Sequence, residues 1–465
     1  MQRSRHGRTI KSNAAAGANG RGRAAQRALC IAVLPAGDDL SELAELLRTA
    51  GVAVAGEIVQ HRETPHPNSY VGPGKLEEVA LAIERDDANL VACDDELTPR
   101  QERTIEAALG VPVIDRTAII LDIFASHANS ADGKLQVELA QLEYNLARMR
   151  GLWTHLERLG GGIGTRGPGE AQIETDRRLA RDRIAALRRR LARVRSTRAV
   201  MRSERERAGL AELALAGYTN AGKSTLLNAL TGADVGVRDR LFHTLDPATR
   251  TLTHDGRTFL LTDTVGFIRK LPHQLVDAFA ATLEETKRAD LILHVADASA
   301  DDAALEQMLR AVDRTLEEIG VGEQPRLLVL NKVDAVAESR RTELGLRHPR
   351  ALLVSALTGE GLDALRDRIA SELHGGLRAV ELLIPYSEGA HVAELHALDG
   401  AIVRSDTAEG VRVRARLPAP AIARYARFLL PRDVAAQRPE EPKPPAPRSS
   451  PAGASASTVL SSGRQ

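Results

Sequence analysis

The stretch ELALAGYTNAGKSTLLNAL at residues 212–230 decides the fold of this chain. It contains Gly217, four further residues, and then Gly222-Lys223-Ser224, between a strand-like apolar run and a helix-like apolar run. This is the context of a phosphate-binding loop, in which backbone N–H groups at the start of a helix surround a phosphate. We expect Lys223 to reach the β- and γ-phosphates of a nucleotide and the hydroxyl of Ser224 to ligate Mg2+.

Three further motifs follow in the order expected of a guanine-nucleotide site, each at the end of a predicted strand. In DTVG, Asp263 can hold Mg2+ through a water molecule, and the N–H of Gly266 can sense the γ-phosphate. In NKVD, the carboxylate of Asp334 can accept from both N1–H and the 2-amino group of guanine, a donor pair that adenine lacks. The strand LLVSAL (352–357) brings the N–H of Ala356 toward guanine O6.

A candidate switch segment, LFHTLDPATR (241–250), lies between the phosphate-binding loop and DTVG. We expect Thr244 to close on Mg2+ and the γ-phosphate in the GTP state. The preceding His243 is interpreted as a solvent-facing switch residue rather than a base. Catalysis is assigned to Lys223, Thr244 and Gly266. The predicted nucleotide contacts are Gly217, Tyr218, Thr219, Asn220, Ala221, Gly222, Lys223, Ser224, Thr225, Phe242, His243, Thr244, Leu245, Asp246, Asp263, Thr264, Val265, Gly266, Asn331, Lys332, Val333, Asp334, Ser355, Ala356 and Leu357.

One residue of the site departs from many signalling GTPases. Phe267 follows DTVG, where those proteins carry the glutamine that orients the attacking water. We therefore predict slow intrinsic hydrolysis, with the catalytic geometry completed by a partner. Asn220 resembles the asparagine of GTPases that recruit K+ in place of an arginine finger, which makes K+ a candidate second ion.

Two heptad patterns flank a glycine-rich stretch upstream of the nucleotide motifs. Apolar residues recur at steps of four and three before and after that stretch, and Arg198 is the one polar interruption. This spacing predicts two helices that form an antiparallel hairpin with residues 160–169 at its tip. The positions are Leu135, Leu139, Leu142, Leu146, Met149, Trp153 and Leu156, then Ala180, Ile184, Leu187, Leu191, Val194 and Met201.

The tip reads GGGIGTRGPG, and residues 162–167 within it match the Gly-x-Gly-x-x-Gly of dinucleotide-binding proteins. That fingerprint must follow a strand and open a helix, whereas here a predicted helix precedes it. Exposed N–H groups and thirteen arginines in residues 177–208 suit RNA instead. The alternative is a flexible connector whose glycines only cap two helices. The candidate RNA contacts are Gly164, Thr165, Arg166, Gly167, Arg188, Arg189 and Arg190.

The rest of the chain supports a multidomain α/β fold. Residues 28–130 alternate strand-like and helix-like runs, as a small domain with a mostly parallel sheet would. After the GTPase motifs, VRVRARL (411–417) indicates a half-exposed strand with an arginine face. The predicted fold is an N-terminal α/β domain with an antiparallel helical hairpin, a Ras-like P-loop GTPase domain and a small C-terminal α/β domain. The predicted boundaries are 1–27 (disordered basic tail), 28–130 (N-terminal domain), 131–208 (hairpin), 209–376 (GTPase domain), 377–432 (C-terminal domain) and 433–465 (disordered Pro/Ser/Ala-rich tail).

Composition restricts the compartment. The 465 residues carry a net charge of +1, and the two cysteines form neither a disulfide framework nor a metal-ligand spacing. This cysteine usage favours a reducing compartment. No apolar run approaches the roughly 20 residues that span a bilayer. We therefore expect a cytoplasmic monomer, with an organellar transit peptide as the alternative for the Arg-rich residues 1–27.

These motifs together resemble the HflX family of ribosome-associated GTPases. The resemblance covers roughly residues 28–430 and rests on GYTNAGKST (217–225) and five further stretches. They are DDELTPRQER (94–103), GKLQVELAQLEY (133–144), GGGIGTRGPGEAQIETDRR (160–178), FHTLD (242–246) and DTVGFIRKLPHQLVDAFAATLEE (263–285).

The resemblance implies a GTPase that binds the large ribosomal subunit and directs the tip of its hairpin at rRNA, which favours RNA contact over the flexible connector. It also implies that the protein splits stalled or idle ribosomes into subunits under stress. One alternative is a GTPase of ribosome assembly or RNA modification. Another is an RNA-binding protein whose nucleotide site is a switch with little turnover; the intact Lys223, Ser224, Thr244 and Asp263 argue against it and Phe267 favours it.

Overall fold

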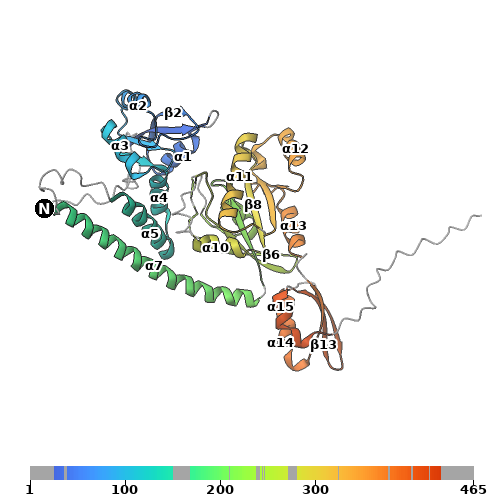
Figure 1. Cartoon of the computed structure of the whole chain (residues 1–465). Coiled ribbons are helices and arrows are strands. Elements are labelled where there is room, and N and C mark those ends of the chain that lie inside the picture. Colours follow the sequence, from blue (N-terminus) through green and yellow to red (C-terminus); the bar gives the residue numbers. More distant parts are fainter. Residues whose placement is uncertain are drawn as a thin grey trace, which may run out of the picture.

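The computed structural model describes residues 26–35, 39–149, 168–208, 210–236, 241–242, 244–245, 247–270, 280–322, 324–374, 378–398, 402–417 and 419–430. The expectations for the two tails, for His243 and Asp246, and for the RNA candidates Gly164, Thr165, Arg166 and Gly167 concern residues outside these ranges. Within the described ranges the strands form three sheets. Figure 1 shows these sheets one after another, with the long helix α7 running beside them. The predicted multidomain α/β fold is confirmed.

The N-terminal unit contains a four-stranded parallel sheet in the order β2-β1-β3-β4. Its central strand β1 is apolar at every position after the first, because helices cover both faces. Ala28, Cys30 and Ala32 face one apolar cluster, and the intervening Leu29 and Ile31 face the other. The strands are β1 (Arg27–Leu34), β2 (Ala53–His61), β3 (Leu90–Cys93) and β4 (Val113–Asp115), and the helices are α1 (Ser41–Thr49), α2 (Pro73–Arg85), α3 (Pro99–Leu109) and α4 (Arg116–His127).

Of two helices in this unit, the start of α3 was predicted from the sequence and α4 was not. Thr98 and Gln101 form the predicted capping box at the start of α3, with Pro99 at the first helical position. Helix α4 is absent from the sequence-based assignment. Most of its residues are buried on every side, so no polar face marks a helical period.

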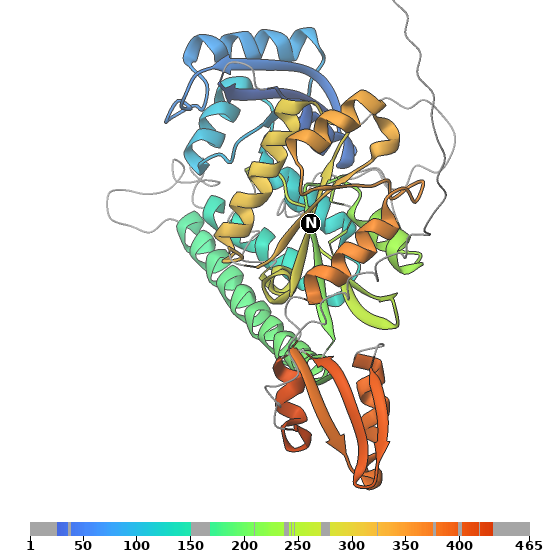
Figure 2. The same cartoon turned by 90° about the vertical axis from the view of Figure 1, so that its right-hand side faces the viewer.

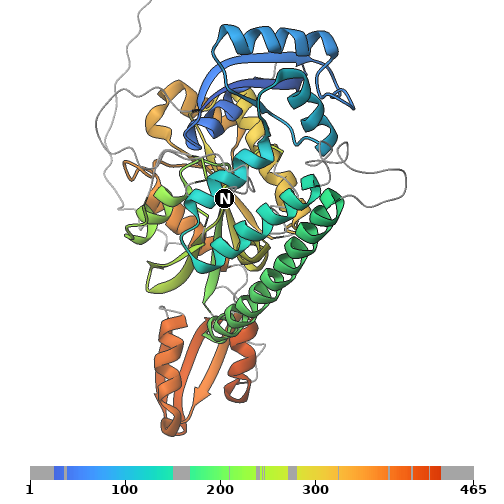
Figure 3. The ribbon, with the colours of Figure 1, turned by 90° about the vertical axis from the view of Figure 1, so that its left-hand side faces the viewer.

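The predicted antiparallel hairpin is formed by α5 (Ala131–Arg148) and α7 (Pro168–Ala208). The two helices lie side by side and run in opposite directions (Figure 3). Ion pairs of 2.7 Å (Arg183–Glu138) and 2.8 Å (Arg188–Glu143) join their polar faces. The apolar seam consists of heptad positions from both helices, namely Leu135, Leu139, Leu142, Leu146, Ile184, Leu187 and Leu191.

The central unit has a six-stranded sheet in the order β10-β9-β8-β5-β7-β6, in which only β6 is antiparallel to its neighbour. Helices α8 and α13 pack on one face and α10 and α11 on the other. The strands are β5 (Ala211–Gly217), β6 (Ala248–His254), β7 (Arg257–Asp263), β8 (Leu291–Asp297), β9 (Arg326–Asn331) and β10 (Leu352–Leu353), and the helices are α8 (Lys223–Thr231), α10 (Ala280–Arg288), α11 (Asp302–Glu318), η2 (Val333–Ala335), α12 (Glu338–Arg347) and α13 (Leu362–His374).

The C-terminal unit is an antiparallel sheet in the order β11-β13-β12. Arg412, Arg414 and Arg416 alternate with buried residues along β13, which confirms the predicted arginine face. Helix α15 contacts α7, so this unit lies at the far end of α7 from the N-terminal sheet (Figure 2). The elements are β11 (Arg378–Ile384), η3 (Tyr386–Glu388), α14 (Ala390–Leu398), β12 (Val403–Thr407), β13 (Gly410–Leu417), α15 (Ala419–Arg424) and η4 (Ala426–Phe428).

In the described part of the chain, every helix is too short or too polar to cross a lipid bilayer.

Candidate functional site

The phosphate-binding loop joins β5 to α8 at the centre of the six-stranded sheet. Gly217 ends β5 so close to the backbone of Val295 that a Cβ atom would overlap it. Gly222 has φ +88° and packs against the side-chain amide of Asn331, so a larger residue would be strained there and would clash. Both glycines are therefore required by the backbone path, and α8 begins at Lys223 with its N-terminus toward the loop.

Lys223 is buried beneath this loop. Its ammonium donates to the carbonyls of Gly217, at 3.0 Å, and Tyr218, at 2.8 Å. Burial lowers the pKa of Lys223 to about 8, and the charge of Asp263 opposes that shift. The lysine is held where a phosphate could replace the loop carbonyls as its partner.

Three oxygen-bearing side chains meet beside Lys223. The hydroxyl of Ser224 lies 2.6 Å from Asp263 Oδ2 and 2.8 Å from the hydroxyl of Thr244. Asp263 is fully buried, and its Oδ1 lacks a hydrogen-bond partner among the described residues. Burial raises the pKa of Asp263, an effect that Lys223 opposes. A buried carboxylate with a spare oxygen beside two hydroxyls is a donor set that suits a hard divalent cation.

The NKVD and SAL motifs lie together at the other end of the loop. Asn331 donates to the carbonyl of Ala221 at 3.0 Å and accepts from the N–H of Ala356 at 3.0 Å. Asn331 thus joins the phosphate-binding loop to the loop after β10. The exposed Asp334 accepts a 2.5 Å hydrogen bond from the hydroxyl of Ser355. Lys332 has φ +67° and forms a 2.7 Å ion pair with Asp297.

The segment after β7 pairs with the phosphate-binding loop through its backbone. Phe267 donates its N–H to Gly217 O at 3.0 Å and accepts from the N–H of Thr219 at 2.8 Å. Its ring is buried in an apolar cluster. Gly266 lies so near Thr219 and Lys223 that a Cβ would meet both at 2.8–3.0 Å. The side chain of Phe267 therefore points away from the phosphate end of the loop.

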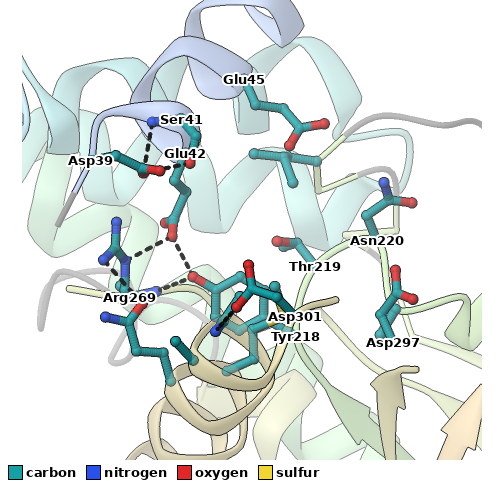
Figure 4. Close-up of a pocket in the computed structure, with 16 residues that line it drawn as sticks. Asp39, Ser41, Glu42, Glu45, Tyr218, Thr219, Asn220, Arg269, Asp297 and Asp301 are labelled. Atoms are coloured by element: carbon teal, nitrogen blue, oxygen red, sulfur yellow. Dashed lines mark hydrogen bonds and ion pairs between the residues drawn. The ribbon is translucent and has the colours of Figure 1, made fainter. Parts of the chain in front are cut away.

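The N-terminal unit packs directly against this site. A cavity of about 370 Å3 lies between α1, the phosphate-binding loop and α11 (Figure 4). On its wall, Glu42 of α1 reaches Tyr218 and Arg269. Outside the cavity, Lys270 pairs with Asp94 of the N-terminal unit at 2.9 Å. Fully buried Arg116 contacts Glu42, Asp94 and the carbonyl of Arg269. These contacts were missed by the sequence analysis, since they join residues far apart in the chain.

Known families and proteins match this chain over most of its length. The family described as GTP-binding GTPase N-terminal matches residues 37–125, GTP-binding GTPase Middle Region matches 127–205, and 50S ribosome-binding GTPase matches 212–332. The GTPase HflX of Caldanaerobacter subterraneus subsp. tengcongensis is 44% identical over 87% of this chain and 94% of its own length. The GTPase HflX of Escherichia coli is 44% identical over 81% of this chain and 89% of its own length.

The chain belongs to the HflX family of GTPases. It is accordingly a GTP hydrolase, and the family resemblance inferred from the motifs is confirmed. Among solved structures, a GTP-binding protein from Sulfolobus solfataricus in complex with GDP is similar, with 26% identity, coverage of 75% of this chain and 98% of that chain, and a TM-score of 0.38.

Most of the predicted nucleotide contacts that the structure describes in this HflX-family chain lie in or beside the phosphate-binding loop, the NKVD loop or the SAL loop. Two of them differ in their surroundings. Phe242 and Leu245 are buried in the apolar cluster that extends into the N-terminal unit, so only their backbone is available to a nucleotide. Of the described RNA candidates, Arg188 pairs with Glu143, whereas Arg189 and Arg190 are exposed on α7.

Proposed function

We propose that the chain binds GTP with Mg2+ at the phosphate-binding loop and hydrolyses it to GDP and phosphate. We further propose that the GTP-bound state binds the large ribosomal subunit and separates stalled ribosomes into subunits. In this proposal Lys223, Thr244 and Gly266 serve catalysis, and Asp334 selects guanine.

The convergence of Ser224, Thr244 and Asp263 beside Lys223 carries the proposal. These residues come from the start of α8, the candidate switch segment and the end of β7. Such an assembly of two hydroxyls, one carboxylate and one ammonium is what a nucleoside triphosphate with its cation requires. Oδ1 of Asp263 supports the assignment, because it has no hydrogen-bond partner among the described residues and a buried carboxylate oxygen is costly to leave unsatisfied.

Mg2+ would be held by the hydroxyls of Ser224 and Thr244, with Asp263 acting through a water molecule. When bound, the ion supplies positive charge that offsets the charge of the phosphates. The remaining work belongs to side chains and backbone of the chain. Lys223 would leave its loop carbonyls for the phosphates, and the N–H of Gly266 would meet the γ-phosphate.

Slow hydrolysis by the isolated chain follows from the position of Phe267. Its buried ring cannot orient an attacking water. We infer that a partner completes the site, and that K+ near Asn220 supplies charge in place of an arginine finger. Asn220 lines the cavity beside the loop and has φ +61°. Turnover that falls strongly when K+ is replaced by Na+ would support the ion, and equal rates would remove it.

The ribosomal partner is supported by two observations. The family that matches residues 212–332 is described as 50S ribosome-binding GTPase. The hairpin helix α7 presents Arg189 and Arg190 to solvent, where they can contact rRNA phosphates. A monomer in the cytoplasm, with the hairpin tip directed at rRNA, is consistent with this partner.

The deciding experiment measures GTP turnover with and without purified large ribosomal subunits, using Lys223→Ala as the inactive control. Strong stimulation by the subunit is expected. Turnover that stays low and unchanged would exclude the ribosome as the activator, and the hairpin would need a different RNA. Subunit splitting, followed by sucrose-gradient sedimentation of stalled ribosomes with GTP, separates this role from ribosome assembly or RNA modification.

A further inference from the structure

One apolar cluster connects the N-terminal unit to both segments that flank the phosphate end of the site. It contains Leu43 and Phe124 from α1 and α4. It also contains Phe242 from the candidate switch segment and Phe267 and Ile268 from the segment after β7. The two segments that should respond to the γ-phosphate are therefore packed on helices outside the central unit.

Phe242 attaches the switch segment to α4, and its neighbours Leu241 and Leu245 are buried in the same cluster. It has φ +56°, a backbone conformation that residues with a Cβ rarely adopt, so surrounding contacts must hold it. Its ring is only 2% exposed and meets Phe124 edge-on, with the ring centroids 4.7 Å apart. Its carbonyl oxygen lies 3.0 Å from Nδ1 of His127, which donates the hydrogen bond in the tautomer protonated at Nδ1. Both anchoring side chains belong to α4.

Thr244 follows Phe242 by two residues. Because an extended chain spans at most about 3.6 Å per residue, the Cα of Thr244 must stay within roughly 7 Å of the Cα of Phe242. The hydroxyl of Thr244 is already 2.8 Å from that of Ser224. The place where α4 holds Phe242 therefore limits where the switch threonine can lie.

We propose that Phe124 and His127 of the N-terminal unit are positioning residues of the GTPase site, which act by holding Phe242 so that Thr244 faces the cation and the γ-phosphate. This inference rests on the proposed nucleotide site and adds a part of it that lies outside the GTPase motifs. It predicts that substitutions of Phe124 or His127 lower the affinity for GTP and leave the affinity for GDP unchanged. The switch threonine is ordered by the γ-phosphate and is released after hydrolysis, so GDP binding does not depend on it.

The test compares binding of fluorescent GDP and of a fluorescent non-hydrolysable GTP analogue to the full chain. His127→Ala removes the hydrogen bond to the carbonyl of Phe242 from a half-buried position and should weaken the GTP analogue about fivefold, with GDP affinity unchanged. His127→Asn should restore binding, because its amide can donate in place of Nδ1. Phe124→Leu keeps an apolar side chain but loses the edge-on ring contact, and should weaken the analogue about threefold.

Ser126→Ala is the matched control. Ser126 is exposed on the same turn of α4, and its hydroxyl bonds to Ile123 O. The Ser126→Ala variant should bind GDP and the GTP analogue with the same affinities as the wild type. Equal losses for GDP and the analogue in His127→Ala would indicate a general structural role and overturn the inference, as would no loss for either nucleotide. A wild-type chain that bound neither nucleotide would instead overturn the proposed nucleotide site.

Discussion

The hydroxyl of Tyr218 donates a hydrogen bond to the carboxylate of Glu42, which lies 176 residues earlier in the chain. The same carboxylate pairs with Arg269 at 3.1 Å and with the buried Arg116. Tyr218 belongs to the phosphate-binding loop, and Arg269 is the third residue after the DTVG motif. One carboxylate of the N-terminal unit is therefore bonded to both sides of the nucleotide site.

Neutralising Glu42 should destabilise the protein. Burial lowers the pKa of Arg116 to about 10, yet its guanidinium remains charged at neutral pH and needs its carboxylate partners. Glu42→Gln leaves Asp94 as the one carboxylate bonded to Arg116 among the described residues. We expect the free energy of unfolding in urea to fall by about 3 kcal/mol.

Glu45→Gln, one turn along α1, is the control for that change. Glu45 pairs with Arg48, whose side chain is 70% exposed, so its loss should cost less than about 0.5 kcal/mol. Similar losses in the two variants would show that the Glu42 network contributes no more than a surface ion pair.

The sequence was sufficient to predict where the phosphate-binding loop and the motifs at the strand ends lie in the fold. Gly217 to Ser224 carry their own backbone requirements, and Asp263 and Asn331 end parallel strands of the same sheet, so their proximity follows from topology. The heptads around Leu139 and Leu187 likewise contain enough information to pair α5 with α7.

The contacts between the units could not be predicted in the same way. Glu42 looks like an ordinary acidic residue in the first turn of a helix, and the sequence gives Phe242 no feature that distinguishes a nucleotide contact from an anchor. Their roles depend on how the N-terminal and central units pack together, which local periodicity does not encode. Helix α4, which supplies Phe124 and His127, has no polar face to reveal it.

GTP affinity should depend on pH through Lys223. Its pKa of about 8 in the free protein means that the ammonium loses its proton as the pH rises above 8, whereas bound phosphates favour the charged form. The dissociation constant for GTP should therefore be nearly constant below pH 8 and increase by up to about tenfold per pH unit above it. Equilibrium titrations with a fluorescent GTP analogue at pH values from about 6.5 to about 9.5 measure how the dissociation constant changes with pH.

Lys223→Arg provides the comparison for the pH profile, because a guanidinium stays charged over this range. Other titrating groups, including the guanine base, are common to both proteins. If the two profiles had the same slope above pH 8, the pKa of Lys223 would not be the cause.

Asp334→Asn should change the base that the site selects. The carboxylate is expected to accept two hydrogen bonds from guanine, and replacing one acceptor oxygen by an amide N–H places a donor against a donor. Affinity for GTP should fall by about 100-fold, while xanthosine triphosphate, which carries a carbonyl in place of the 2-amino group, should bind better than to the wild type.

Ser355→Ala is the control, because it removes the 2.5 Å hydrogen bond to Asp334 and keeps the carboxylate. It should weaken GTP binding less and leave xanthosine triphosphate excluded. Unchanged selectivity in Asp334→Asn would show that another group reads the base.

Ribosome binding should depend on salt through the exposed arginines of α7. Each phosphate contact made by an arginine contributes close to one unit to the slope of log affinity against log salt concentration. Arg189→Ala combined with Arg190→Ala should therefore weaken binding to large subunits and reduce the magnitude of this slope by about two.

Arg183→Ala is the matched control, because Arg183 already pairs with Glu138 across the hairpin at 2.7 Å. Sedimentation with purified subunits in the presence of a non-hydrolysable GTP analogue measures both quantities. A slope unchanged in the double variant, or reduced equally in the control, would contradict a phosphate contact at this part of α7.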